Sequence, residues 1–143
     1  MSMGKLCDTS KETDMKVTGF NHFAIETDDY ESSLAFFRDI LGFKHIETID
    51  TAEFSSTNLA IPGGCVVELV SRHEKEKQAT IKTESNVHHI AFNVDDVEAS
   101  EATLRKSGVE IVLPCTNLEE FNTKVVQCRD PNGIIMAFRK DLR

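Results

Sequence analysis

The sequence predicts an α+β fold of two βαβββ repeats, which form a cupped, barrel-like mixed sheet with the helices outside. Three observations carry this prediction: an internal repeat, strand-like alternation at the start of each copy, and glycine- or proline-rich turns between the later segments. The chain has 143 residues, of which 40% are hydrophobic. This is enough to build a core for one domain or for two small fused modules.

The repeat relates two segments whose starting positions, His22 and His89, lie 67 residues apart. Residues 22–38 and 89–105 share eight identities over seventeen aligned positions. Chance matching would give roughly one identity over this length at ordinary amino-acid usage. The similarity therefore indicates a duplicated structural unit in which each copy begins with a histidine.

Each copy has the pattern of a strand, a helix and three further strands. Apolar and polar residues alternate at 20–27 and 87–94, as in a strand with one buried face. The later strands are expected at 43–49, 53–61 and 65–70 in the first copy, and at 109–113, 121–129 and 134–139 in the second.

Two signals mark each expected helix. An acidic residue followed three positions later by Glu resembles a capping box, and a glycine stands where the helix should end. These residues are Asp28, Glu31 and Gly42 in the first copy, and Asp95, Glu98 and Gly108 in the second.

These patterns divide the chain into four parts: a leader at 1–16, a first module at 17–71, a polar linker at 72–85 and a second module at 86–143. The charge run at the start of the linker is most simply a solvated segment. The leader lacks the apolar run of a signal peptide, and no apolar stretch is long enough to span a membrane.

Composition excludes several classes of function. The formal net charge is −8 and no basic stripe is present, which argues against nucleic acid as a partner. The four cysteines form no C-x-x-C pair, so neither a zinc finger nor a disulfide framework is expected. Without an export signal, we expect reduced thiols and a cytoplasmic location.

The motifs, in their order and spacing, resemble those of the vicinal-oxygen-chelate superfamily, which includes glyoxalase I, bleomycin-resistance proteins and extradiol dioxygenases. The motifs are HFAI from His22, FFRDILGF from Phe36, VVEL from Val66, HIAFNVDD from His89 and DPNG from Asp130. They cover residues 19–140. The resemblance implies two curled four-stranded half-sheets around a cleft that binds a small molecule.

By this resemblance the metal ligands come from the first and fourth strands of each half, at His22, Glu68, His89 and Ala137. Alanine cannot bind a metal, so the fourth ligand is water, substrate or another residue, or is absent. Strand alternation independently places His22 and His89 on corresponding faces. Two imidazoles and a carboxylate suit Zn²⁺, Ni²⁺, Co²⁺, Mn²⁺ or Fe²⁺ and leave positions open for a substrate.

Glu53 and Glu68 are the candidate catalytic residues. Members similar to methylmalonyl-CoA epimerase carry a proton-abstracting Glu near the position of Glu53, at the start of the third strand. A solvated edge glutamate is the alternative for Glu53. Glu68 could itself move a proton if it leaves the metal, and it is costly to bury unless it is paired or bound.

Three functions remain open. The first is a metal-dependent glyoxalase-I-like lyase or isomerase that acts on a substrate with vicinal oxygens through an enolate-type intermediate, which Glu68 favours. The second is an extradiol-dioxygenase-like oxygenase or a thiol transferase, whose usual carboxylate position is occupied by Ala137. The third is a non-catalytic, ligand-sequestering protein of bleomycin-resistance type.

The resemblance also implies a homodimer, since sites of this superfamily often lie at or between subunits. The sequence leaves open whether His22 and His89 meet within one chain or across two. It also leaves open the substrate and the identity of the metal.

Overall fold

The computed structural model describes residues 15, 16, 18–74 and 87–143. The expected leader up to residue 14 and most of the expected linker lie outside the described residues. The first module contains β1 (His22–Glu26), α2 (Tyr30–Leu34), the π-helix η1 (Ala35–Ile40), β2 (Lys44–Asp50), β3 (Phe54–Ile61) and β4 (Cys65–Arg72). The second contains β5 (Ile90–Asn93), α4 (Val97–Lys106), β6 (Ile111–Leu118), the short helix η2 (Glu119–Phe121), β7 (Thr123–Arg129) and β8 (Ile135–Asp141).

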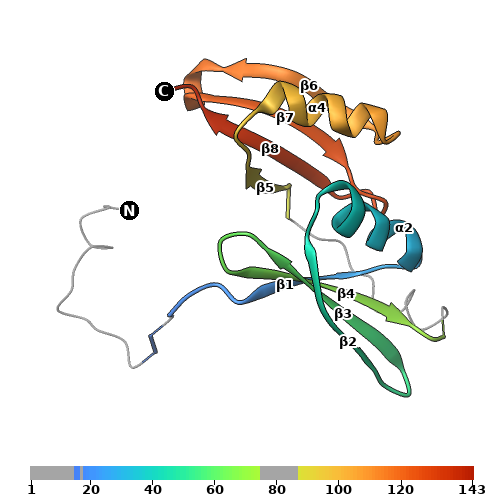
Figure 1. Cartoon of the computed structure of the whole chain (residues 1–143). Helices are drawn as coiled ribbons and strands as arrows, with labels where there is room; N and C mark the ends of the chain where they lie inside the picture. Colours follow the sequence, from blue (N-terminus) through green and yellow to red (C-terminus); the bar gives the residue numbers. More distant parts are fainter. Residues whose placement is uncertain (1–14, 17, 75–86) are drawn as a thin grey trace.

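The strands form two four-stranded mixed sheets, ordered β1-β4-β3-β2 and β5-β8-β7-β6 (Figure 1). In each sheet the first and fourth strands are parallel, and the other neighbours are antiparallel. The predicted α+β fold with two βαβββ units is confirmed. Within the described part of the chain no strand ladder joins β1 to β5, so the two sheets do not close into one barrel.

Both helices begin one residue later than the sequence pattern indicated. The carboxylates of Asp29 and Asp96 accept from the backbone N–H three residues onward, at 3.2 and 2.9 Å. Asp28 and Asp95 are therefore wrong as predicted caps. Extended or intermediate backbone angles at Asp29 and Asp96 allow the cap geometry, since an N-cap residue precedes the helical conformation.

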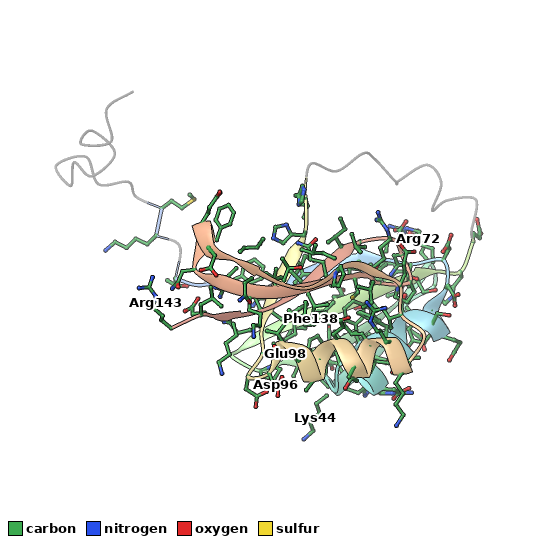
Figure 2. The ribbon with its side chains drawn as sticks, turned by 90° about the horizontal axis from the view of Figure 1, so that it is seen from above. Lys44, Arg72, Asp96, Glu98, Phe138 and Arg143 are labelled. Atoms are coloured by element: carbon green, nitrogen blue, oxygen red, sulfur yellow. The ribbon has the colours of Figure 1, made fainter. Side chains whose placement is uncertain are left out.

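One hydrophobic core joins the two modules. Ring contacts run from Phe37 to Phe43 at 6.2 Å, from Phe43 to Phe92 at 5.6 Å, and from Phe92 to Phe138 at 5.5 Å between centroids. Phe138 lies in the interior among the strands, whereas Lys44 projects from the surface (Figure 2). Because these rings come from both modules, burying them fixes the two sheets against each other.

The turn between β7 and β8 adds a polar contact between the modules. Asn132 Nδ2 donates to Ser33 Oγ of α2 at 3.0 Å and to Asp130 Oδ2 at 3.1 Å. Burial raises the pKa of Asp130, while backbone N–H groups of Asn132 and Ile134 oppose that shift by donating to its carboxylate at 2.9 and 2.7 Å. The expected turn at residues 130–133 therefore also serves as a contact with the first module.

Three strand ends differ from the sequence expectation in ways that affect the site. Pro114 has no backbone N–H to donate to a neighbouring strand. β6 nevertheless continues past it, because the pairing of β6 with β7 shifts register between Leu113 and Thr116. β5 is shorter than expected, so His89 precedes it. β4 includes Arg72, which the sequence pattern had placed at the start of the linker. No helix of the described residues is both long and apolar enough to span a bilayer.

The core also determines thiol reactivity, since Cys128 is fully buried in β7 and burial raises its pKa to about 12. At pH 8 only about one Cys128 thiol in ten thousand would be ionised. We expect iodoacetamide to alkylate the partly exposed Cys65 well before Cys128 in the native protein. Peptide mass spectrometry over time measures both rates, with urea-unfolded protein as the control. Equal native rates would contradict this burial.

Candidate functional site

His22 and Glu68 meet on the solvent-facing side of the first sheet. The parallel register of β1 and β4 pairs Ala24 with Glu68, and alternation puts His22 on the same face. His22 Nε2 lies 3.5 Å from Glu68 Oε1, and the two side chains are 45% and 24% exposed. The other ring nitrogen, Nδ1, lies 2.6 Å from Asn21 Oδ1. An imidazole and a carboxylate are thus held side by side within reach of solvent.

A buried hydroxyl holds the second oxygen of Glu68. Ser56 Oγ donates to Glu68 Oε2 at 2.5 Å, and Ser56 itself is only 6% exposed. One carboxylate oxygen is therefore fixed by the protein while the other lies toward His22. Ser56 could not be identified from the sequence, because its contact depends on the cross-strand register of β3 and β4, which the residue pattern does not specify.

His89 immediately precedes β5 of the second sheet. It is exposed, and its Nδ1 lies 2.8 Å from Nδ1 of His88. At this distance one imidazole nitrogen donates a hydrogen bond and the other accepts it. Strict strand alternation would place His88 and His89 on opposite faces, but both residues precede the regular strand and their rings come together.

Ala137 occupies in the second sheet the position that Glu68 has in the first. The β5–β8 register pairs it with Ala91, as the β1–β4 register pairs Glu68 with Ala24. Its neighbour on β7 is Gln127, so the nearest polar side chain in register is an amide. The two halves therefore differ in their capacity to bind a cation.

The predicted ligand set is divided between the two sheets. His22 and Glu68 lie together, whereas His89 lies on the second sheet. Among the residues that the structure describes, no three His, Cys, Asp or Glu side chains are arranged to hold one metal ion. A single chain thus presents two of the three expected ligands in one place.

Glu53 lies just before β3 instead of opening it. It is exposed, and its carbonyl accepts from the backbone N–H of His73 at 2.9 Å. The β3 residue paired with Glu68 is Asn58, five positions further along. At about 3.3 Å per residue, Glu53 is displaced along the strand by roughly 16 Å from that pairing. One chain does not bring Glu53 to Glu68.

A second polar pair lies four residues further along the same two strands. Arg72 Nε donates to Glu26 Oε1 at 2.9 Å, and the guanidinium lies 5.7 Å from the centroid of the Phe54 ring. Glu26 Oε2 is buried and has no hydrogen-bond partner among the described residues. Arg72 could have been found from the sequence, because it shares the strand parity of Glu68.

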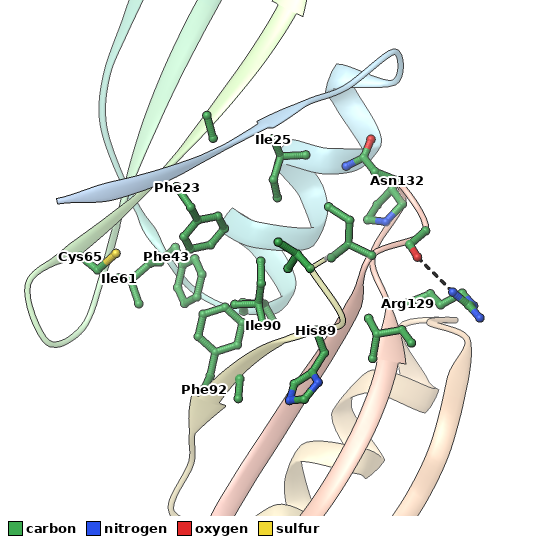
Figure 3. A pocket seen from close by; sticks show the side chains of 18 of the residues that line it. Phe23, Ile25, Phe43, Ile61, Cys65, His89, Ile90, Phe92, Arg129 and Asn132 are labelled. Atoms are coloured by element: carbon green, nitrogen blue, oxygen red, sulfur yellow. Dashed lines mark hydrogen bonds between the residues drawn. The ribbon is translucent and has the colours of Figure 1, made fainter. Parts of the chain in front are cut away.

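A cavity of about 1530 Å³ opens between the modules, along the edges of β1 and β5 (Figure 3). Its walls are largely aromatic and aliphatic, with a few polar groups; they include Phe23, Phe43, Phe92, Glu26, His89 and Asn132. His22 and Glu68 are not part of its lining, so the cavity lies beside their pair. Apolar walls with a few polar groups are typical of small-molecule sites.

The family model described as "Glyoxalase/Bleomycin resistance protein/Dioxygenase superfamily" matches residues 19–138. The chain is 31% identical over 98 residues to the uncharacterized protein YwkD of Bacillus subtilis, covering 67% of this chain and 77% of that protein. It is 25% identical over 123 residues to the lactoylglutathione lyase of Haemophilus influenzae, covering 82% and 88% of the two chains.

Solved structures share the fold at lower identity. The protein SMU.1112c has a TM-score of 0.73 at 21% identity, covering 87% of this chain and 100% of that one. The antibiotic-binding protein TnmS3 from Streptomyces sp. CB03234 has a TM-score of 0.71 at 18% identity, covering 89% and 98%. The fosfomycin resistance protein FosX from Listeria monocytogenes has a TM-score of 0.71 at 16% identity, covering 88% and 93%.

Proposed function

The chain belongs to the glyoxalase/bleomycin resistance protein/dioxygenase superfamily, and on this premise we propose that it is a metal-dependent lyase or isomerase of glyoxalase-I type. Its substrate would be a small molecule with two vicinal oxygens. The observation that carries the proposal is the His22–Glu68 pair, 3.5 Å apart on an exposed sheet face. The likeness to a lactoylglutathione lyase supports it. We also propose a cytoplasmic location.

The donor chemistry fits one divalent ion such as Zn²⁺, Ni²⁺, Co²⁺, Mn²⁺ or Fe²⁺. An imidazole nitrogen and a carboxylate oxygen are ordinary ligands for these ions. His22, Glu68 and His89 would hold the ion, which when bound supplies a positive charge that stabilises the anionic oxygen of an enolate-type intermediate.

The contacts of the two catalytic candidates favour different roles. Ser56 fixes one oxygen of Glu68, which favours a constant ligand over a group that leaves to carry a proton. The Glu53 carboxylate has no such contact among the residues that the structure describes, and it lies far along the strand from Glu68 within one chain. We therefore propose Glu53 as the proton-abstracting base only in an assembly that brings it to the cleft from a second copy.

We propose that the site is completed in a homodimer. His89 lies next to a different sheet from His22 and Glu68. In the described part of the chain β1 pairs only with β4 and β5 only with β8, so each has one free edge. Exposed apolar side chains, Phe20 and Val87, flank these edges. A two-fold dimer would use the same surface twice and set the first sheet of one copy against the second sheet of the other.

A second candidate function is sequestration of a ligand without catalysis. Ala137 favours it, because that position can supply no metal ligand, and the apolar cavity could hold a ligand without any metal. The structural likeness to an antibiotic-binding protein supports this alternative. An oxygenase is favoured less, because its carboxylate would be expected at Ala137.

Metal content tests the main proposal. We expect about one divalent ion per chain in protein purified without chelators, and its loss in the His22→Ala/His89→Ala double variant, because two of three ligands are removed. Inductively coupled plasma mass spectrometry measures the ion. Loaded protein would then be screened on 2-oxoaldehyde–thiol adducts and acyl-CoA epimers. Absence of metal, with no thermal shift on adding Ni²⁺, Zn²⁺, Co²⁺ or Mn²⁺, would favour sequestration.

Mixing two single variants tests whether the site is shared between copies. Each of His22→Ala and His89→Ala would damage every site in its own homodimer. A mixed dimer would regain one of its two sites, so metal content should reach about half of the wild-type value in isolated mixed dimers. It should reach about a quarter in an equimolar mixture refolded together, because random pairing makes about half of the dimers mixed. Separately refolded variants are the control. No recovery in verified mixed dimers would place all the ligands in one chain.

Removal of the Ser56 hydroxyl tests how Glu68 is held. We expect Ser56→Ala to weaken Co²⁺ binding by about 10- to 100-fold, as is typical when a group that orients a metal ligand is lost. Ser56→Thr should restore most of the affinity. Ser55→Ala is the matched control, because Ser55 donates to the exposed Asp50 instead. Titration followed by Co²⁺ absorption gives the affinities, and equal values for Ser56→Ala and Ser55→Ala would refute the role.

A further inference from the structure

We propose that Asn21 and His88 are positioning residues for the metal centre, because each holds the Nδ1 nitrogen of the histidine that follows it. His22 and His89 would then each present Nε2 to the ion. The inference rests on the proposed function for the presence of the ion, and it deepens that function by assigning the residues that prepare two of its ligands. The two contacts themselves belong to the protein without metal.

The first contact joins the side chains of Asn21 and His22. His22 Nδ1 lies 2.6 Å from Asn21 Oδ1. An amide oxygen can only accept, so the proton of this hydrogen bond is carried by the His22 ring. A neutral imidazole has one N–H and one bare nitrogen, so a proton on Nδ1 leaves the lone pair on Nε2. Nε2 is the nitrogen that faces Glu68, at 3.5 Å.

The bare Nε2 of His22 and the carboxylate of Glu68 form a pair that calls for a cation. Glu68 Oε1 is an acceptor as well, and the other oxygen of this carboxylate is already held by Ser56. Two acceptor atoms that face each other attract only when a proton or a metal ion lies between them. The Asn21 contact at 2.6 Å is much shorter than the Glu68 contact at 3.5 Å, so it keeps the ring proton at Nδ1 and leaves the Glu68 side for the ion.

The second copy of the repeat makes the same kind of contact. Asn21 and His88 are equivalent positions, 67 residues apart, as are His22 and His89. His89 Nδ1 lies 2.8 Å from His88 Nδ1, and the two rings are nearly perpendicular, at 83°. One of these nitrogens donates and the other accepts. With His89 as the donor the two copies are alike, since both ligands then have a protonated Nδ1 and a bare Nε2.

The backbone explains how these side chains reach their neighbours in sequence. In a regular strand successive side chains point to opposite faces, which keeps adjacent residues from contacting each other through them. Asn21 precedes β1, and His88 precedes β5. Both lie where the chain is not yet a regular strand. Groups that hold the second nitrogen of a metal-binding histidine fix its tautomer and the direction of its ring, and an accepting amide or imidazole in this place does both.

The ring protons of the metal-free protein test the contacts directly. Two-bond proton–nitrogen NMR spectra of chelator-treated protein, at alkaline pH where imidazoles are neutral, show which nitrogen of each histidine carries the proton. We expect Nδ1–H at His22 and His89 in the wild type. Asn21→Ala should shift His22 toward Nε2–H, and His88→Ala should shift His89 in the same way, because each variant loses the acceptor. The exposed His45 is the internal control, with unchanged signals in every variant.

Conservative variants separate positioning from a general effect on the fold. Asn21→Asp and His88→Asn each keep an oxygen that can accept, and the second substitution places in the second copy the residue type found at position 21. The Nδ1–H form should therefore persist in both. Nε2–H at both ligand histidines of the wild type, or unchanged tautomers in folded Asn21→Ala and His88→Ala, would overturn the proposal.

Cobalt affinity then tests whether the positioning serves the proposed metal centre. We expect Co²⁺ to bind Asn21→Ala and His88→Ala about 10- to 100-fold more weakly than the wild type, with recovery in Asn21→Asp and His88→Asn. His45→Ala is the matched control, because it removes an exposed histidine of β2. Equal affinities for the wild type and both alanine variants would overturn the proposal and leave the metal centre standing. If the wild type binds no metal while the tautomers are as expected, the proposed function fails and the two contacts stand.

Discussion

The parallel pairing of β1 with β4 is the constraint on which the candidate site depends. In parallel neighbours, residues in register share a face, so the pairing of Ala24 with Glu68 determines which side chains meet. A shift of one residue would turn His22 into the core and Ile25 toward solvent. The register is specified because Ile25 is buried in the core, at 5% exposure. The hydrophobic pattern of β1 therefore fixes the polar contacts as well.

The packing between modules explains why the two halves hold separate parts of the predicted ligand set. Phe43 of the first module contacts Phe92 of the second, and the β7–β8 turn reaches Ser33. These contacts bury the helix-facing sides of both sheets and leave the opposite face of the first sheet open. An open polar face and a free edge strand are suited to another surface, which is why we propose that a second copy completes the site.

Much of the fold could be predicted from the sequence because duplication makes its signals appear twice. The repeat beginning at His22 and His89, with alternation around each, was enough to predict two βαβββ units. The caps were misplaced by one residue because each copy has two adjacent aspartates and either can accept from the helix. Ser56 was missed because its contact with Glu68 depends on the register between β3 and β4. The presence of candidate ligands was predictable from residue type, whereas their distribution between two sheets depends on module packing.

The differences between the two copies argue for a division of roles. In the first sheet, Glu68 stands in the position that Ala137 holds in the second. Glu68 lies 3.5 Å from His22, whereas His89 precedes β5 and its ring contacts that of His88. The first module thus brings an imidazole and a carboxylate together, and the second does not. We therefore infer that the first module supplies the polar centre of the site, while the second contributes His89 and apolar walls.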